Sequence, residues 1–362
     1  MSDGRNVQLI KNTVILGIGQ LIPKLIAIVS LPLLTDHLSI GDYGIYDTIL
    51  SIGILALPLL TLLIQQAAFR FIIDNQNDKQ EIITNTFVLI FLSSLLVLGI
   101  ASIIMFFTRI STSLIWAVVF LYMSEALYDT IGQVSRGLGK NIQYSIGVII
   151  YSLTNFAGLI ILVIKACVDL KNILIVSSIA YIISFAFIMC SISLWQFINV
   201  QKINKHIIKD MLKYSFPIIP SSISLWIVNL SDRLLITAFL GVDKSGLYAA
   251  GNKIPGLCGV AYSVFNLAWT ETAARCADDK DRNGYYTRLY EALFSFLMGI
   301  FLIVLTLSPL IFKILVDEKF SEGSKQMPIL FVAVLLNCLV SFYGGIYIAL
   351  KKTKQVGYSS AL

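Results

Sequence analysis

The sequence predicts an all-α, polytopic membrane protein, and three observations support that prediction. Hydrophobic residues form 57% of the 362-residue chain and charged residues only 13%, whereas soluble globular domains carry about 25% charged residues. Apolar runs of about 20 residues, the length that a helix needs to cross a bilayer, recur along the whole chain. Lys and Arg collect in alternate connections between these runs, as they do in multi-pass membrane proteins.

Ten apolar runs predict ten membrane-spanning helices. The first is too long for the apolar part of a cleavable signal peptide, so it is interpreted as the first span. Runs two, three, five, six, nine and ten have no ionisable side chain in their central stretches, whereas runs one, four, seven and eight do. The runs cover approximately residues 13–34, 43–69, 82–107, 111–133, 141–164, 172–198, 214–240, 245–270, 289–312 and 326–350.

The positions of Lys and Arg predict a cytoplasmic N-terminus. With that orientation, 17 of the 27 Lys and Arg residues lie in cytoplasmic tails and connections, and 7 lie on the opposite side. The remaining 3, Lys24, Arg233 and Lys253, fall within predicted helices. The formal net charge of +6 therefore reflects membrane topology, and no nucleic-acid partner is expected.

A repeat at an offset of 202 residues relates the first two predicted helices to the seventh and eighth. Identical residues at this offset include Thr35 and Thr237, Gly44 and Gly246, and Tyr46 and Tyr248. Because six helices separate the partners, both repeats enter the membrane in the same direction, as parallel repeats do. We therefore expect two six-helix bundles around a central cavity, residues 1–200 and residues 201–362. The second holds only four predicted helices, so we expect it to be incomplete.

The sequence contains no constellation typical of an enzyme or of a metal site. The stretch GLGK at residues 137–140 lacks the spacing of a phosphate-binding loop. The five cysteines have no metal-ligand or disulfide spacing and are interpreted as packing residues; they are Cys167, Cys190, Cys258, Cys276 and Cys338. We expect no catalytic residue, no metal and no resident cofactor, and we expect an ion gradient or product withdrawal to supply the energy.

Charged side chains away from the ends of the predicted helices are found only in runs one, four, seven and eight, and they are Lys24, Glu125, Asp129, Asp232, Arg233 and Lys253. Each would cost at least about 2.5–3.5 kcal/mol at a lipid-facing helix centre. We therefore expect them to face the protein interior or a water-filled cavity.

The positions of Lys24, Arg233 and Lys253 along their helices predict an anion-binding cavity in the outer half of the membrane. Polar and aromatic side chains share helix faces in the same helices, a combination that suits a sugar attached to an anionic group. The predicted substrate-binding residues are Gln20, Lys24, Trp226, Asn229, Arg233, Asn252, Lys253 and Tyr262. The alternatives are a permanent ion pair for Lys24 or Arg233, and for Lys253 a side chain that extends to the membrane surface.

Glu125 and Asp129 lie on one polar face of the fourth predicted helix. Acids in this position take up protons or sodium in coupled transporters, so both are candidate ion-coupling residues. The alternative is that one of them pairs with Lys24 or Arg233. Asp232 points about 100° away from Arg233 on a helix, so we expect it to make a structural pairing with a neighbouring helix.

The seventh and eighth predicted helices contain two prolines, Pro217 and Pro220, followed by SDR at residues 231–233, GLY at residues 246–248 and KIP at residues 253–255. The turn GDYGIYD at residues 41–47 precedes the second helix. In these features the chain resembles the polysaccharide repeat-unit flippases (Wzx-type oligosaccharide flippases) of the multidrug/oligosaccharidyl-lipid/polysaccharide (MOP) exporter superfamily. Members of that family usually have at least twelve helices.

The resemblance implies a flippase that moves undecaprenyl-pyrophosphate-linked oligosaccharide repeat units to the outer leaflet by alternating access. The product would be O-antigen, capsule or another surface polysaccharide, and the location a bacterial cytoplasmic (inner) membrane. The implied partners are the lipid-linked oligosaccharide, membrane lipids, a polysaccharide polymerase and assembly proteins. One alternative is a MATE-like multidrug exporter, although the first helix has Lys24 and no carboxylate. The other is a membrane-integral glycosyltransferase or polymerase, although no large outer loop is predicted.

Overall fold

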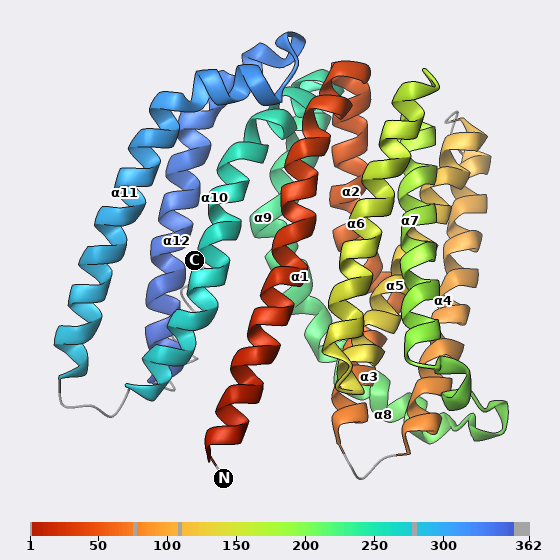
Figure 1. Cartoon of the computed structure of the whole chain (residues 1–362). Coiled ribbons are helices and arrows are strands. Elements are labelled where there is room, and N and C mark those ends of the chain that lie inside the picture. Colours follow the sequence, from red (N-terminus) through yellow and green to blue (C-terminus); the bar gives the residue numbers. More distant parts are fainter. Residues whose placement is uncertain (1, 75–77, 108–110, 277–280, 351–362) are drawn as a thin grey trace. The chain divides into compact units, whose positions relative to one another are not determined.

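The computed structural model describes residues 2–74, 78–107, 111–276 and 281–350, and these residues form α-helices, short 3-10 helices and no strand (Figure 1). The chain divides into two compact units, Met1–Gly246 and Leu247–Leu362. The prediction of an all-α chain is confirmed. Lys351, Lys352 and Lys354, which contribute to the predicted topology, lie outside the described residues.

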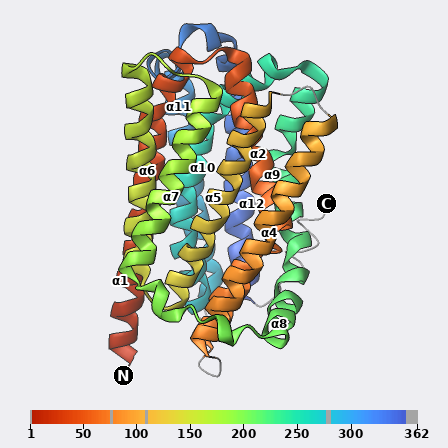
Figure 2. The same cartoon turned by 90° about the vertical axis from the view of Figure 1, so that its right-hand side faces the viewer.

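The first unit contains nine helices within its described residues: α1 (Ser2–His37), α2 (Ile40–Thr61), α3 (Ile64–Ile73), α4 (Lys79–Phe107), α5 (Thr112–Gly137), α6 (Asn141–Ile164), α7 (Leu170–Ser191), α8 (Lys205–Ser215) and α9 (Ile219–Leu240). Helices α4 to α7 run side by side (Figures 1 and 2). Ile64, Ile82, Ile131 and Ile188 are fully buried between α3, α4, α5 and α7, so this side of the unit has a close-packed apolar core.

The second unit is built from α10 (Val242–Arg275), which begins in the first unit, α11 (Arg282–Leu315) and α12 (Met327–Ala349). Trp269 of α10 stacks on Phe342 of α12 with ring centroids 4.3 Å apart, and its Nε1 donates to the Phe342 carbonyl at 3.0 Å. The Tyr286 hydroxyl of α11 donates to the Ala273 carbonyl of α10 at 2.6 Å. Aromatic side chains with satisfied polar ends therefore hold the three helices together.

Each predicted span lies largely on helix in the structure, although the sixth, residues 172–198, extends past the end of α7 at Ser191. Seven helical segments of the described chain are long and apolar enough to cross a membrane: Ile40–Thr61, Lys79–Ile103, Thr112–Gly137, Asn141–Ile164, Leu170–Ser191, Arg282–Leu315 and Glu318–Tyr347. The predicted spans at residues 13–34, 214–240 and 245–270 lie on α1, α9 and α10.

The prediction of one continuous helix over residues 43–69 is wrong. A break at Leu62 and Leu63 divides this segment into α2 and α3. Both leucines have left-handed backbone angles, with φ of 52° and 53°. This conformation costs an L-residue roughly 1–2 kcal/mol. Tertiary packing offsets that cost, since Leu63 and the following Ile64 and Ala67 are buried in the core.

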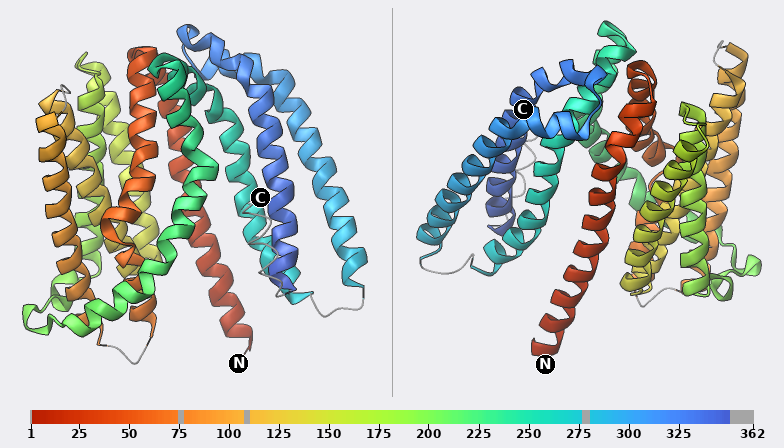
Figure 3. Two further views of the ribbon diagram at one scale, coloured as in Figure 1. Left: turned by 180° about the vertical axis from the view of Figure 1, so that it is seen from behind. Right: turned by 45° about the horizontal axis from the view of Figure 1, so that its top comes forward.

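The segment between α7 and α8 is bonded to residues at the start of α4. Lys202 forms an ion pair with Asp78, and the Asn204 amide donates to Glu81 at 2.6 Å. The hydrogen bond from Lys202 lowers the pKa of Asp78 below its usual value, so this contact is present at neutral pH and is lost as the pH falls. Helix α8 lies across the ends of α3 and α4 and places Met211 in the core (Figure 3).

Two glycines related by the 202-residue offset approach each other closely. A Cβ on Gly44 would lie 2.2 Å from the Val242 carbonyl oxygen, and a Cβ on Gly246 would lie 2.1 Å from the Ile40 carbonyl oxygen. Ile40 and Val242 are themselves 202 residues apart. The contact is therefore reciprocal, as expected for two repeats related by an axis that passes between them.

Candidate functional site

Helices α2 and α9 run antiparallel and are joined by polar contacts on one face of each. The Thr48 and Thr237 hydroxyls are 3.3 Å apart, and Trp226 Nε1 donates to the Ser51 carbonyl at 2.7 Å. On α9, positions 226, 233 and 237 repeat at spacings of seven and four, which places them on one helix face. These contacts fix the register of the two helices.

Arg233 and Asp47 form a buried ion pair between the same two helices. Arg233 Nε donates to Asp47 Oδ2 at 2.6 Å, and the two residues are 9% and 5% exposed. Asp47 lies seven residues after the start of α2 and Arg233 lies seven residues before the end of α9. At 1.5 Å per residue both are about 10 Å from the helix ends, so the charges meet at one depth.

Asp232 lies closer to Arg233 than helix geometry alone predicts. Its Oδ1 is 3.6 Å from Arg233 Nη1 and also accepts the Arg233 backbone N–H at 2.9 Å. Asp232 was expected to point away from Arg233 and to pair with a neighbouring helix, but its carboxylate lies beside the arginine on its own helix. The guanidinium is consequently balanced by two carboxylates, neither of which is Glu125 or Asp129.

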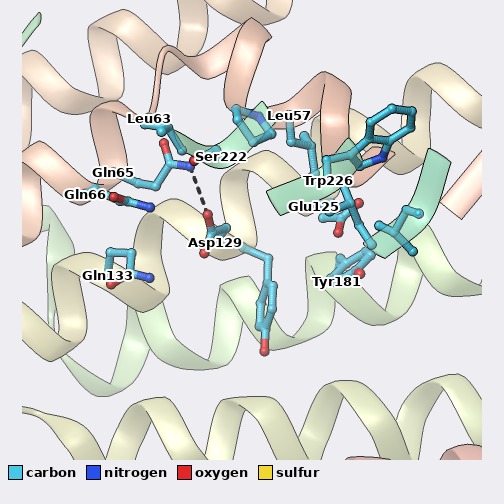
Figure 4. A pocket seen from close by; sticks show the side chains of 14 residues that line it. Leu57, Leu63, Gln65, Gln66, Glu125, Asp129, Gln133, Tyr181, Ser222 and Trp226 are labelled. Atoms are coloured by element: carbon cyan, nitrogen blue, oxygen red, sulfur yellow. Dashed lines mark hydrogen bonds between the residues drawn. The ribbon is translucent and has the colours of Figure 1, made fainter. Parts of the chain in front are cut away.

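A pocket of about 580 Å³ opens beyond these contacts, between α2, α3, α5, α7 and α9 (Figure 4). Its lining contains two carboxylates, three glutamine amides and three aromatic rings, and no Lys, Arg or His. The lining residues are Ile54, Leu57, Pro58, Leu63, Gln65, Gln66, Glu125, Tyr128, Asp129, Gln133, Tyr181, Ser222, Trp226 and Leu230. The pocket therefore combines carboxyl and amide groups with aromatic and aliphatic side chains.

One end of the pocket, the aromatic end, is formed by Trp226, Tyr181 and Glu125 (Figure 4), and Tyr128 also lines the pocket. The Tyr128 and Tyr181 rings lie 5.2 Å apart. Tyr181 also stacks on Tyr151 of α6, which lies outside the lining, with ring centroids 4.2 Å apart. The three tyrosine rings contact one another and form a continuous aromatic wall.

The other end, the amide end, is formed by Gln65, Gln66, Gln133 and Asp129 (Figure 4). Gln65 Nε2 donates to Asp129 Oδ2 at 3.0 Å. Gln65 is only 5% exposed, and its Oε1 has no hydrogen-bond partner among the described residues. A buried amide oxygen without a protein partner is costly, so a water molecule or a ligand is expected to bond to it.

The structure brings together only part of the predicted site. Glu125, Asp129 and Trp226 line the pocket, and Arg233 lies beyond it in the ion pair with Asp47. Lys24 is half-buried on α1 and does not line the pocket. Asn252, Lys253 and Tyr262 belong to the second unit, and the side chains of Gln20 and Asn229 lie outside the described part of the structure.

Sequence reasoning missed Asp47, Gln65 and Tyr181. Asp47 lies near the start of its helix, where a charged residue is common, so its sequence position gave no signal. Its distance from the end of α2 equals the distance of Arg233 from the end of α9. Gln65 follows the helix break at Leu62. No sequence signal predicts this break, so the position of Gln65 could not be predicted either. Tyr181 stands alone in an apolar run, and only the fold places it beside Glu125.

In the second unit, Tyr262 lines an apolar pocket of about 490 Å³ between α10 and α11. Its neighbours there include Cys258, Phe265 and Leu293, and no charged residue lines this pocket. The Tyr262 side chain is 7% exposed, and its hydroxyl has no hydrogen-bond partner among the described residues. Tyr262 thus lies in apolar rather than basic surroundings.

Among the described residues, no group of three or more His, Cys, Asp or Glu side chains is placed to hold a metal ion.

Replacement of Trp226 by phenylalanine tests the contact between α2 and α9. The change removes the N–H that donates to the buried Ser51 carbonyl, so we expect a loss of about 1–3 kcal/mol of stability. Thermal unfolding of the purified protein in detergent measures it. Trp195→Phe is the matched control, because Trp195 is 56% exposed, and an equal loss in both variants would contradict the assignment.

The sequence comparison identifies one family. The family model for polysaccharide biosynthesis proteins matches residues 9–270. No curated protein sequence matches the chain.

Solved structures with the same fold are transporters. An inward-facing multidrug resistance MATE family transporter of the MOP superfamily has a TM-score of 0.70 at 12% identity, over 93% of this chain and 85% of that one. A MOP superfamily transporter from Pyrococcus furiosus, described as having a binding pocket of reverse polarity, has a TM-score of 0.63 at 12% identity, over 96% and 83%. The MATE multidrug transporter DinF-BH has a TM-score of 0.60 at 16% identity, over 97% and 84%. At these identities the similarity establishes the fold.

Proposed function

Since the chain belongs to the polysaccharide biosynthesis protein family and has the fold of MOP superfamily transporters, we propose that it is a flippase for lipid-linked oligosaccharides. The proposed substrate is an undecaprenyl-pyrophosphate-linked repeat unit, carried from the cytoplasmic to the outer leaflet of a bacterial cytoplasmic membrane. Residues 1–200 and 201–362 are proposed to form the two repeats that alternate access between them.

The observation that carries this proposal is the composition of the 580 Å³ pocket. A glycan offers hydroxyl groups, which bond to amides and carboxylates, and apolar ring faces, which pack on aromatic side chains. Gln65, Gln133 and Asp129 supply the first kind of group, and Trp226 and Tyr181 supply the second. The pocket is large enough for a small saccharide.

The same pocket does not suit the pyrophosphate, because its two carboxylates would repel that group. We propose that the pyrophosphate lies outside the pocket, near cations such as Lys24 or Lys253. Arg233 can join them only if Asp47 releases it. Its proposed role in binding the head group therefore depends on a change at the contact between α2 and α9.

The predicted topology places the pocket on the side where the substrate would be loaded. With a cytoplasmic N-terminus, the Asp47–Arg233 pair lies near the outer surface. The pocket-lining residues of α2 and α9 lie further toward the cytoplasmic ends of those helices. The contacts of α2 with α9 would then close the outer side while the pocket receives a newly made repeat unit.

A second candidate function is export of lipophilic cations. Two carboxylates beside aromatic rings, with no basic side chain in the lining, also suit a flat cationic molecule. Energy-dependent exclusion of an ethidium-type dye from cells that express the protein tests this candidate. The flippase proposal expects no exclusion above that of cells carrying an empty plasmid.

Complementation of a bacterial strain that lacks its repeat-unit flippase tests the proposed function. We expect the chain to restore surface glycan, and we expect Trp226→Ala to reduce it at least tenfold at equal protein level. Trp195→Ala is the control, because that exposed tryptophan lies outside the pocket. Full glycan export by Trp226→Ala would contradict the assignment of the pocket to the glycan.

A further inference from the structure

Helix α8 has an apolar side that packs on the first unit and a basic side that is exposed. Met211 is buried in the apolar core between α3 and α4, and Ile207 packs against that core. Lys205, Lys209 and Lys213 follow one another at a spacing of four, so they share a helix face, and all three are exposed. These three residues are called the lysine face below.

The positive charge of the lysine face is not balanced by ion pairs within the described part of the chain. None of its three ammonium groups lies within 4.0 Å of a carboxylate oxygen there. The carboxylates around the helix have other partners, since Asp210 lies 3.5 Å from His206 Nε2 and Asp78 pairs with Lys202. The lysine face is therefore available to an anionic partner from outside the chain.

The start of α8 lies near the end of a membrane-spanning helix. Helix α4 is long and apolar enough to cross a membrane from Lys79 onward. Asn204, the N-cap of α8, donates its backbone N–H to Asn85 Oδ1 at 3.0 Å. Asn85 lies six residues into α4, which is about 9 Å from the helix end at 1.5 Å per residue. Amphipathic helices that lie in a membrane surface are found about 5–10 Å into the boundary between head groups and acyl chains.

Exposed apolar side chains lie at both ends of α8. Ile203 precedes the helix and is 45% exposed, and Phe216 follows it and is 66% exposed. The Tyr214 ring packs edge-on against Phe71 of α3 with ring centroids 6.0 Å apart, which holds this end of α8 against the protein. At a membrane surface, such apolar side chains enter the acyl boundary while lysine ammonium groups stay at the level of the head groups.

We propose that the lysine face of α8, with Ile203 and Phe216 beside it, binds anionic phospholipids such as phosphatidylglycerol in the leaflet at this end of α4. Acidic head groups attract a basic amphipathic helix through its charge, and the acyl boundary accepts its apolar side chains. A protein partner fits this surface less well, because lysine is depleted at the centre of protein interfaces. With the predicted topology the leaflet is the cytoplasmic one.

Fluorescence quenching in vesicles tests the lipid surface without any transport assay. Phe216→Trp places a reporter beside the lysine face, and the reporter signal is the difference between this variant and the unmodified chain. The vesicles consist of phosphatidylcholine with a small, equal fraction of brominated lipid, which is either phosphatidylglycerol or phosphatidylcholine. Bromine atoms quench a tryptophan that they contact. Brominated phosphatidylglycerol should quench the reporter roughly threefold more strongly, because the lysines concentrate it locally, and added salt should reduce this preference.

Two triple variants, made in the Phe216→Trp protein, assign the preference to the lysine face. Replacement of all three of its lysines by glutamine should remove the preference for phosphatidylglycerol. The matched control makes the same charge change at three exposed lysines of other segments and should keep the preference. These control positions are Lys165, Lys171 and Lys313.

Equal quenching by the two brominated lipids in the Phe216→Trp protein would overturn the lipid surface, as would a preference that persists without the lysine face. A reporter that neither lipid quenches would show that water or protein covers the surface and would overturn it too. If Phe216→Trp does not fold, Ile203→Trp serves as the reporter at the other end of α8. No glycan takes part in this experiment, so its failure would leave the proposed function untouched.

Discussion

Replacement of Arg233 by alanine is expected to destabilise the protein by about 3–5 kcal/mol and to abolish glycan export. The reason is that the change removes the cation that Asp47 faces at 2.6 Å in a buried environment. Breaking a buried ion pair from one side costs this much because a charge remains in the interior. The measurement is the Tm of the purified protein, which should fall by about 10 °C.

Two further variants separate the ion pair from head-group binding. Asp47→Asn should cost less than Arg233→Ala, because Arg233 keeps the Asp232 carboxylate at 3.6 Å. Lys253→Ala, which removes a half-buried cation of the second unit, should also cost less. A stable Arg233→Ala protein that cannot export glycan would show that the arginine acts on the substrate and contributes little to the fold. Normal stability together with normal export in Arg233→Ala would contradict both roles.

Replacement of Gly44 by alanine is the second change with a large expected effect. The added Cβ would lie 2.2 Å from the Val242 carbonyl oxygen, so the backbones must separate. Overpacking against a rigid backbone typically costs about 1–3 kcal/mol, and occasionally more. We expect a reduced yield of folded protein in detergent extracts and a lower Tm, and we expect the reciprocal change Gly246→Ala to behave in the same way.

The control for this prediction is Gly99→Ala, because Gly99 is also helical and has no atom within 4 Å of the position of an added Cβ. That variant should be neutral or slightly stabilising, since alanine favours the helix. If Gly44→Ala were as stable as Gly99→Ala, the close reciprocal contact of the repeats would be excluded.

Hydropathy alone predicts most of this fold, because a bilayer forces each long apolar run to satisfy its own backbone as a helix. The break at Leu62 and Leu63 was not predictable, since leucine favours helices and no Gly or Pro occupies either position. Its cause is packing between distant segments, where Ile64 and Ala67 enter the core. Local sequence patterns carry no information of that kind.

The candidate site likewise contains residues that local sequence patterns predict and residues that only long-range contacts bring together. The acidic face with Glu125 and Asp129 was visible, because both residues lie on one helix at a spacing of four. The partner of Arg233 was not visible, because Asp47 is 186 residues away and only the pairing of α2 with α9 brings it near. A charged residue inside an apolar run can be recognised in the sequence, whereas the residue that neutralises it can be identified only from the tertiary fold.

Reconstitution of the purified chain in lipid vesicles tests the central proposal most directly. The vesicles contain a fluorescent undecaprenyl-pyrophosphate glycan in both leaflets, and an impermeant reagent destroys the fluorophores that it reaches. Without a flippase about half of the signal should survive. We predict that the chain removes most of the protected half and that Trp226→Ala does not. An unchanged protected half, in vesicles that hold correctly folded protein, would contradict the proposed function.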